Sequence, residues 1–255
     1  MRTAAVVNLK GGVGKSTTAI NLALIMAKEH KKRVLLVDND IQANVSKFFS
    51  VHSYDYKSME NVLRDEGTIA EDIIRSSGRY GLDIIPANMN LDAAAVDLML
   101  DKEANQMTRL KEVLQQVEDR YDYCFIDCPP GVGINVLNAL VAANDVIIPI
   151  KADKNALDGM EELTEVIEEV RPYNPGLSMV KCLVTMFTND IEVVKGEEAL
   201  QKSTYSTFYT HIRHSKKVNA WTFEGKSLVE VTPKSAATRD YKNLALEYMD
   251  LTKGA

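Results

Sequence analysis

The segment VVNLKGGVGKST (residues 6–17) gathers three glycines, two lysines and two hydroxyl side chains. A glycine-rich loop lets backbone N–H groups turn inward around an anion, because no Cβ stands in the way. The lysine and the hydroxyl that close such a loop reach the phosphates and Mg²⁺ of a nucleotide. We therefore predict that the loop residues bind a nucleotide: Gly11, Gly12, Val13, Gly14, Lys15, Ser16 and Thr17.

The loop departs from the usual phosphate-binding pattern at two positions. That pattern is Gly, four residues, then Gly-Lys-Ser/Thr, which would require a glycine at position 9. Position 9 is Leu9, and the next residue, Lys10, is an additional lysine. A second cation inside a phosphate loop needs an explanation of its own.

Carboxylates follow two apolar runs. Asp127 ends DYCFID (122–127), and Asp38 and Asp40 lie at the end of RVLLVDND (33–40). Phosphoryl transfer depends on Mg²⁺ and on a positioned water, with little covalent chemistry for the protein. We predict that Asp127 holds Mg²⁺ together with Ser16, and that Asp38 or Asp40 orients the attacking water. Each acidic motif alone would fit an ordinary solvated turn.

The elements that must position these residues alternate along the chain. Short apolar runs predict buried strands, and the segments between them carry helical periodicity. The predicted strands are 3–8, 33–38, 82–87, 122–127, 145–150 and 178–186. The predicted helices are 15–29, 90–119 (two helices), 133–143, 156–171, 190–202 and 236–251, the last with Tyr241, Leu244, Ala245, Tyr248 and Leu251 on one stripe.

This alternation predicts an α/β fold: a mostly parallel, twisted sheet with helices on both faces. Ligands bind such sheets at the carboxyl ends of the strands. The glycine loop and the three aspartates all fall there in the predicted order. Length alone allows one large α/β domain or two small ones for 255 residues.

Composition excludes several classes of protein. The chain is 45% hydrophobic and 26% charged, as in ordinary globular proteins. No apolar run approaches the roughly 18 residues needed to span a bilayer. Three cysteines without a CxxC pair argue against zinc and Fe–S sites and favour a reduced, cytoplasmic protein.

The net charge of −6 conceals a basic segment, which we define as residues 202–242. It carries eight Lys/Arg against three acids, a balance of +5, so the rest of the chain carries −11. A basic stripe on an acidic protein is typical of phosphate-backbone binding, although a solvated face is the commoner meaning of a charge run. Trp221 lies in the segment, and we predict that it packs rather than stacks on bases.

The quoted motifs resemble those of the ParA (Soj-like) partitioning ATPases. KGGVGKST, LLVDNDIQAN, YDYCFIDCPPGVGINVLNAL and IIPIKADKNALDGMEEL carry the resemblance, which runs from residue 3 to about residue 250. These proteins belong to the deviant Walker A group of P-loop NTPases, which also contains MinD and the nitrogenase iron protein. The resemblance implies a single domain over 1–255, without the N-terminal helix-turn-helix extension of larger ParA proteins.

The resemblance also implies roles for individual residues. Lys10 matches the signature lysine that reaches a partner's phosphates in a nucleotide-sandwich dimer, where a cation in trans offsets transition-state charge. Asp40 would position the water and contribute to the Mg²⁺ site. Met186 and Arg213 would contact the nucleotide. DNA contacts would come from Arg213, Lys216, Lys217 and Lys234.

The chain departs from the family pattern at two of these places. Ile41 stands where the family usually has proline after the second aspartate. Arg213 replaces the proline of the family's IPRNVRL stretch, and Lys217 falls at the position of its DNA-contacting arginine.

The resemblance implies a function for the whole chain. A cytoplasmic, nucleoid-associated ATPase would dimerise on MgATP and bind DNA without sequence preference. A ParB-like or other centromere-binding partner would then stimulate hydrolysis and release it, and so move DNA copies apart, with no membrane involved. One alternative is a MinD-like membrane-cycling ATPase; the other is an electron-transfer ATPase like the nitrogenase iron protein.

Overall fold

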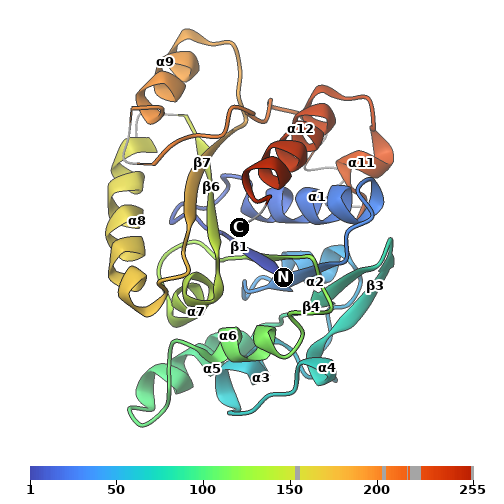
Figure 1. Ribbon diagram of the computed structural model, residues 1–255, viewed down its shortest axis with the longest axis vertical. Helices are drawn as coiled ribbons and strands as arrows, with labels where there is room; N and C mark the ends of the chain where they lie inside the picture. Colours follow the sequence, from blue (N-terminus) through green and yellow to red (C-terminus); the bar gives the residue numbers. More distant parts are fainter. Residues whose placement is uncertain (153–155, 203–204, 217, 219–224, 254–255) are drawn as a thin grey trace.

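One sheet organises the molecule, and we describe it from a computed structural model (Figure 1). The structure describes residues 1–152, 156–202, 205–216, 218 and 225–253. Within them, seven strands lie in the order β3-β4-β2-β5-β1-β6-β7. The strands are β1 Arg2–Val6, β2 Val34–Asp38, β3 Arg75–Arg79, β4 Leu82–Ile85, β5 Tyr123–Asp127, β6 Asp145–Lys151 and β7 Met179–Thr185.

All strand pairs are parallel except β3 with β4. The central strands are apolar and buried along their length, as sheets covered on both faces require. The six predicted strands are confirmed, with shifts of one or two residues at their ends. Sequence patterning missed β3, because RSSGR is a polar edge strand that alternates between half-buried and exposed positions.

The helices cover both faces of the sheet, as predicted. They are α1 Lys15–Lys28, α2 Asn44–Phe48, α3 Met59–Arg64, α4 Ala70–Ile73, α5 Asn90–Leu100, α6 Arg109–Gln115, α7 Ile134–Ala142, α8 Ala156–Val170, the 3₁₀ helix η1 Arg171–Tyr173, α9 Ile191–Leu200, α11 Leu228–Val231 and α12 Ala236–Leu251. One apolar core joins the sheet to α1, α2, α11 and α12, and the other joins it to α3–α8. The short helices α2, α3, α4 and α11 were not predicted, since one turn or two carries too little periodicity.

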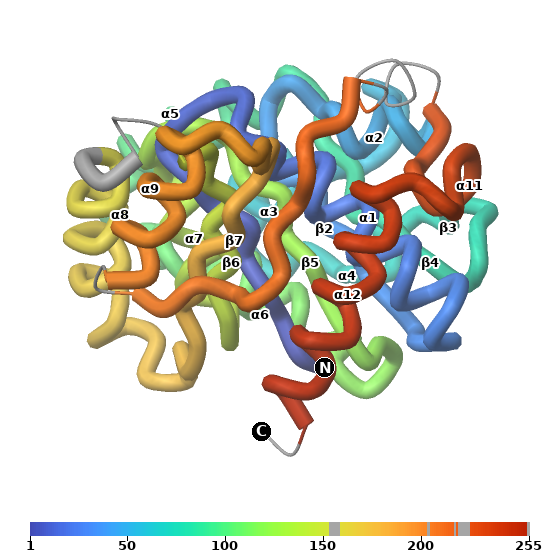
Figure 2. The backbone as a smooth tube through the Cα atoms, turned by 90° about the horizontal axis from the view of Figure 1, so that it is seen from above, coloured from blue at the N-terminus to red at the C-terminus, as the bar shows by residue number. Residues whose placement is uncertain are grey.

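Helix α12 packs against α1 on one face of the sheet. Ser235 caps its N-terminus by accepting a hydrogen bond from the Thr238 N–H, and its apolar stripe is buried as predicted. Leu251, in the last turn of the same stripe, is 45% exposed. The Tyr248 hydroxyl donates to Asp145 at 2.7 Å, and Asp145 also pairs with Arg2. Figure 2 shows the N-terminus and the end of α12 side by side.

Candidate nucleotide-binding site

The glycine loop joins β1 to α1 at the carboxyl edge of the sheet. Gly12 and Gly14 have φ values of 73° and 94°, in the left-handed region that favours glycine. Helix α1 begins directly after Gly14, so the first N–H groups of the helix face the space above the loop. The loop therefore has the backbone conformation that a phosphate-binding site requires.

Lys15 is buried at the centre of this loop. Its side chain is 7% exposed, and Nζ donates to the Lys10 carbonyl oxygen at 2.8 Å. Burial lowers the pKa of Lys15, and the carboxylates of Asp127 and Asp40 oppose that change. A partly desolvated ammonium in this position favours an incoming anion.

Asp127 lies beside the loop, at the end of β5. The strand register places it between Val6 of β1 and Asp38 of β2. It is fully buried, and neither of its carboxylate oxygens makes a well-formed hydrogen bond with the described residues, although the Ser16 hydroxyl lies close enough to lower its pKa. Burial raises its pKa well above the usual range, and the neighbouring carboxylate of Asp38 raises it further.

A buried carboxylate without a well-formed hydrogen bond fits a hydrated cation, because metal-bound water supplies the missing hydrogen bonds. The described residues contain no group of three or more His, Cys, Asp or Glu side chains that could hold a metal alone. Mg²⁺ at this position would therefore take its ligands from Ser16, nucleotide phosphates and water, with Asp127 bonded to that water. The chemistry of the donor set suits Mg²⁺, which keeps several waters when bound.

The structure separates Asp38 from Asp40. Asp38 Oδ2 accepts hydrogen bonds from the Ser46 N–H at 2.7 Å and the Ser46 hydroxyl at 2.6 Å, while Oδ1 accepts from the Asp40 N–H. Burial raises the pKa of Asp38 to about 6. Asp40 lies at the edge of the site, and its Oδ1 accepts from the Gln42 N–H at 2.9 Å. Asp38 thus fixes the loop after β2, which leaves Asp40 as the candidate for water positioning.

Several polar residues that the motif analysis missed hold these loops in place. Asn8 donates to the Pro149 carbonyl of β6 at 2.7 Å and accepts from the Lys10 N–H at 2.8 Å. The Thr185 hydroxyl at the end of β7 donates to the Val13 carbonyl at 2.8 Å. Asn39 and Asn135 donate to each other's backbone carbonyls, so the loop after β2 is tied to α7. Asn39 directly follows a predicted strand, and Asn8 and Thr185 lie at the ends of two others, which is the signal that could have found them; Asn135 lies in a predicted helix.

A cavity of about 160 Å³ opens beside the loop. Its lining includes Thr17, Met186, Arg213, Lys216 and Tyr241. Met186 has a φ of 53°, an uncommon conformation for a non-glycine residue that occurs often at ligand sites. The structure therefore places Met186 and Arg213 on one wall, next to the phosphate loop.

Asp240 of α12 fixes the Arg213 side chain. Its carboxylate accepts from the Arg213 N–H at 3.0 Å and from the guanidinium at 2.9 and 2.5 Å. This bidentate pair offsets the charge of Arg213 and orients the cavity wall. The pair explains how an arginine can occupy the place of the family's proline.

Comparisons with known proteins agree with this geometry. Residues 1–179 match the sequence model of a family described as an AAA domain. The chain is 34% identical over 249 residues to the sporulation initiation inhibitor protein Soj of Bacillus subtilis, which covers 95% of this chain and 96% of that protein. It is also 34% identical over 246 residues to the chromosome partitioning protein ParA of Myxococcus xanthus, covering 95% and 86% of the two chains. The chain belongs to the ParA/Soj family.

Solved structures include a similar fold with a nucleotide bound. The cobyrinic acid a,c-diamide synthase of Mycobacterium smegmatis, with an ATP analogue and magnesium, superposes with a TM-score of 0.85 at 26% identity. The match covers all of this chain and 96% of that one. The P-loop ATPase fold expected for a ParA/Soj protein is thus confirmed.

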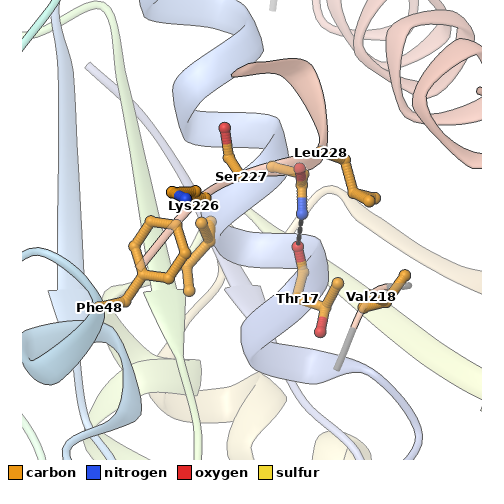
Figure 3. A pocket seen from close by; sticks show the side chains of 8 residues that line it. Thr17, Phe48, Val218, Lys226, Ser227 and Leu228 are labelled. Carbon is orange, nitrogen blue, oxygen red and sulfur yellow. Dashed lines mark hydrogen bonds between the residues drawn. The ribbon is translucent and has the colours of Figure 1, made fainter. Parts of the chain in front are cut away.

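A second, much smaller cavity lies between α1 and α11 (Figure 3). Its volume of about 10 Å³ is roughly that of one water. Figure 3 shows Thr17, Phe48, Val218, Lys226, Ser227 and Leu228 around it. In this ParA/Soj protein it is a packing gap between the nucleotide-binding helix and α11, and it is too small for a nucleotide.

The Lys and Arg side chains in the described part of the basic segment differ in their exposure and in their ion pairing. Lys216 and Lys234 are exposed. Arg213 is bound to Asp240, and Lys242 pairs with Glu29 of α1 at 2.7 Å. Lys217 and Trp221 lie outside the described residues. The exposed cations of this ParA/Soj chain therefore include two of the four predicted DNA-binding residues.

Two features bear on the electron-transfer and membrane-cycling alternatives, the first through the cysteines and the second through helix α12. Cys124, Cys128 and Cys182 are buried and free, and burial raises the pKa of the Cys128 thiol beside Asp127. The apolar face of α12 packs on the core rather than facing outward. Among the described residues, no helix combines the length and apolar character that a membrane crossing requires.

Proposed function

We propose that this protein binds and hydrolyses MgATP to drive DNA partitioning. The observation that carries the proposal is the fully buried Asp127 carboxylate, whose two oxygens make no well-formed hydrogen bond, beside the Ser16 hydroxyl, Lys15 and the phosphate loop. A magnesium-bound nucleotide satisfies both residues at once. Hydrated Mg²⁺ donates to Asp127, and the phosphates accept from Lys15 and the loop N–H groups.

Each residue of the site has a separate role in this proposal. The loop from Gly11 to Thr17 binds the phosphates, with Ser16 as a ligand of Mg²⁺. Asp40 orients the attacking water and stands close to the Mg²⁺ waters. Met186 and Arg213 form the wall against the base. Phosphoryl transfer depends mainly on the positions and charges of these groups. Small changes in this geometry therefore alter the rate of hydrolysis more than the affinity for MgATP.

Lys10 completes the site from a second copy of the chain. A cation supplied in trans stabilises the charge on the transferred phosphoryl group, as an arginine finger does. Leu9 in place of the usual glycine is tolerated when a partner subunit closes the loop. The active form is then a homodimer with two nucleotides at its interface, which explains the additional lysine.

The dimer would bind DNA through the basic segment of each subunit. Lys216, Lys217 and Lys234 would contact phosphates without reading bases, so binding is independent of sequence. The charge of Arg213 is offset by Asp240, so Arg213 contributes less to DNA binding than the exposed lysines do. A ParB-like partner would stimulate hydrolysis and release the dimer, and the protein would reside in the cytoplasm on the nucleoid.

The test is the ATPase rate of the pure protein alone, with unrelated DNA duplexes, and with the product of the adjacent gene. We expect MgATP hydrolysis that rises when both are added. Binding to anionic vesicles with ATP, and to no duplex, would support the MinD-like alternative. A visible absorption band of an iron–sulfur cluster would support the electron-transfer alternative.

A further inference from the structure

The end of the Lys10 side chain lies against helix α8 of its own subunit. A methyl group placed on Gly159, in the first turn of α8, would lie 3.1 Å from Lys10 Cε, 3.7 Å from Nζ and 3.8 Å from Cδ. These are the three nearest atoms, and all belong to Lys10. The space that a side chain would occupy at position 159 is therefore filled by the tip of Lys10.

Glycine at this position destabilises helix α8 relative to most other residues. It is less favourable than alanine by about 0.8–1 kcal/mol in a helix interior. Gly159 has no positive φ that would require glycine, in contrast to Gly12 and Gly14. The contact with Lys10 is the feature of the described structure that alanine would disturb.

The backbone of Lys10 is held firmly while its side chain rests there. Its N–H donates to Asn8, and its carbonyl accepts from Lys15 Nζ at 2.8 Å. The Lys15 ammonium is also the group expected to bind the phosphates. A nucleotide that draws the Lys15 ammonium toward its phosphates therefore weakens the hydrogen bond to the Lys10 carbonyl. Nucleotide binding thus acts directly on the backbone of Lys10.

We propose that Gly159 is a positioning residue that forms a seat for Lys10 within the subunit. Lys10 occupies this seat before dimerisation and leaves it to reach the partner's phosphates, so the two placements compete. The proposal rests on the proposed function, in which Lys10 acts in trans. Filling the seat raises the fraction of molecules whose Lys10 is available to a partner.

The test is a double-mutant cycle on dimerisation, with wild type, Gly159→Ala, Lys10→Ala and the double variant. Dimer formation is measured by analytical ultracentrifugation with Mg²⁺ and a non-hydrolysable ATP analogue, so hydrolysis plays no part. We expect Gly159→Ala to dimerise at about two- to tenfold lower concentration, the factor that corresponds to forcing a side chain off its rotamer. The same change should have no effect in the Lys10→Ala background.

The cycle distinguishes the seat from the helix preference of alanine, which would act equally in both backgrounds. An equal shift in both backgrounds, no shift, or weaker dimerisation by Gly159→Ala would each overturn the proposal. A wild type that never dimerises would instead contradict the proposed function.

A second measurement tests the contact without a dimer. In the nucleotide-free monomer labelled with ¹³Cε-lysine, the NMR signal missing from Lys10→Ala identifies Lys10. That signal should move in Gly159→Ala, and an unchanged signal would show that Lys10 does not rest on α8.

Discussion

At the scale of single residues, the site contains a buried ammonium and a buried carboxylate that do not form an ion pair within hydrogen-bonding distance of each other. Lys15 is almost fully buried and donates to a backbone carbonyl, while neither Asp127 oxygen makes a well-formed hydrogen bond with the described residues. Burying unpaired charge costs free energy, which the proposed nucleotide and Mg²⁺ would recover. In this proposal the site is less stable empty than occupied, and its residues can be tested one at a time.

Lys15→Ala should abolish useful nucleotide binding. The phosphates lose the lysine supplied by their own subunit, and a charge-assisted contact of this kind corresponds to about a 100-fold loss of affinity. Isothermal titration calorimetry with MgATP measures the effect, and circular dichroism checks that the variant folds. Unchanged affinity in a folded variant would remove Lys15 from the site.

Asp40→Ala should leave MgATP bound but reduce hydrolysis by about 10²–10⁴-fold. A residue that positions the water acts on the chemical step and spares binding. Single-turnover hydrolysis and light scattering measure the rate and the trapped dimer. Should hydrolysis continue at the wild-type rate, water positioning belongs to another residue.

Ser46→Ala should destabilise the fold by about 1–3 kcal/mol, because it removes a buried donor from Asp38 and an acceptor from the Ala87 N–H. Urea unfolding of the nucleotide-free protein measures this loss. Ser53→Ala, which removes an exposed hydrogen bond, is the matched control and should change stability by less than about 0.5 kcal/mol. Equal stability of the two variants would contradict the structural role of the Ser46–Asp38 pair.

At the scale of elements, the described basic segment lies along α11, α12 and the loop that borders the base cavity. Lys216 both lines that cavity and is exposed, so one short stretch borders the cavity proposed for the base and also faces solvent. Helix α12 supplies Asp240 to Arg213 from the opposite side. The nucleotide and the proposed DNA surface therefore share elements rather than lying on separate ones.

Changing Lys216 and Lys234 to alanine together should weaken binding to every duplex by a similar factor. Each lost phosphate contact reduces the slope of log affinity against log salt by about 0.9. Fluorescence anisotropy over a salt series, with ATP and with ADP, measures the slope. Lys242→Ala is the control, since its ammonium is paired with Glu29. An unchanged slope in the double variant would move the DNA surface to other residues.

At the scale of the whole molecule, the proposed sandwich dimer makes each active site a shared one. Mixing Lys10→Ala with Lys15→Ala should restore turnover, because a mixed dimer holds one site with Lys15 in cis and Lys10 in trans. Neither variant alone should hydrolyse ATP at the wild-type rate. The steady-state ATPase rate against mixing ratio measures this, and a mixture no faster than its components would contradict catalysis in trans.

The sequence by itself determined the phosphate loop, the positions of six strands along the chain and the placement of Asp127 at a strand end, while the order of the strands in the sheet came from the structure. These features are local, since apolar runs and glycine spacing depend on neighbours in the chain. The polar edge strand β3 and the one- or two-turn helices were missed, because their stability comes from packing rather than from their own pattern.

Only the tertiary structure shows that Asp38 already accepts hydrogen bonds from Ser46, which supports the proposal that Asp40, the residue implied by the family resemblance, positions the water. It alone brought Asp240 to Arg213 and Gly159 to Lys10, residues far apart in the chain that meet when the helices pack on the sheet. A motif records which side chains stand near one another in sequence. Which of them have partners is settled by long-range packing, where a buried charge must find its counterpart or remain without one.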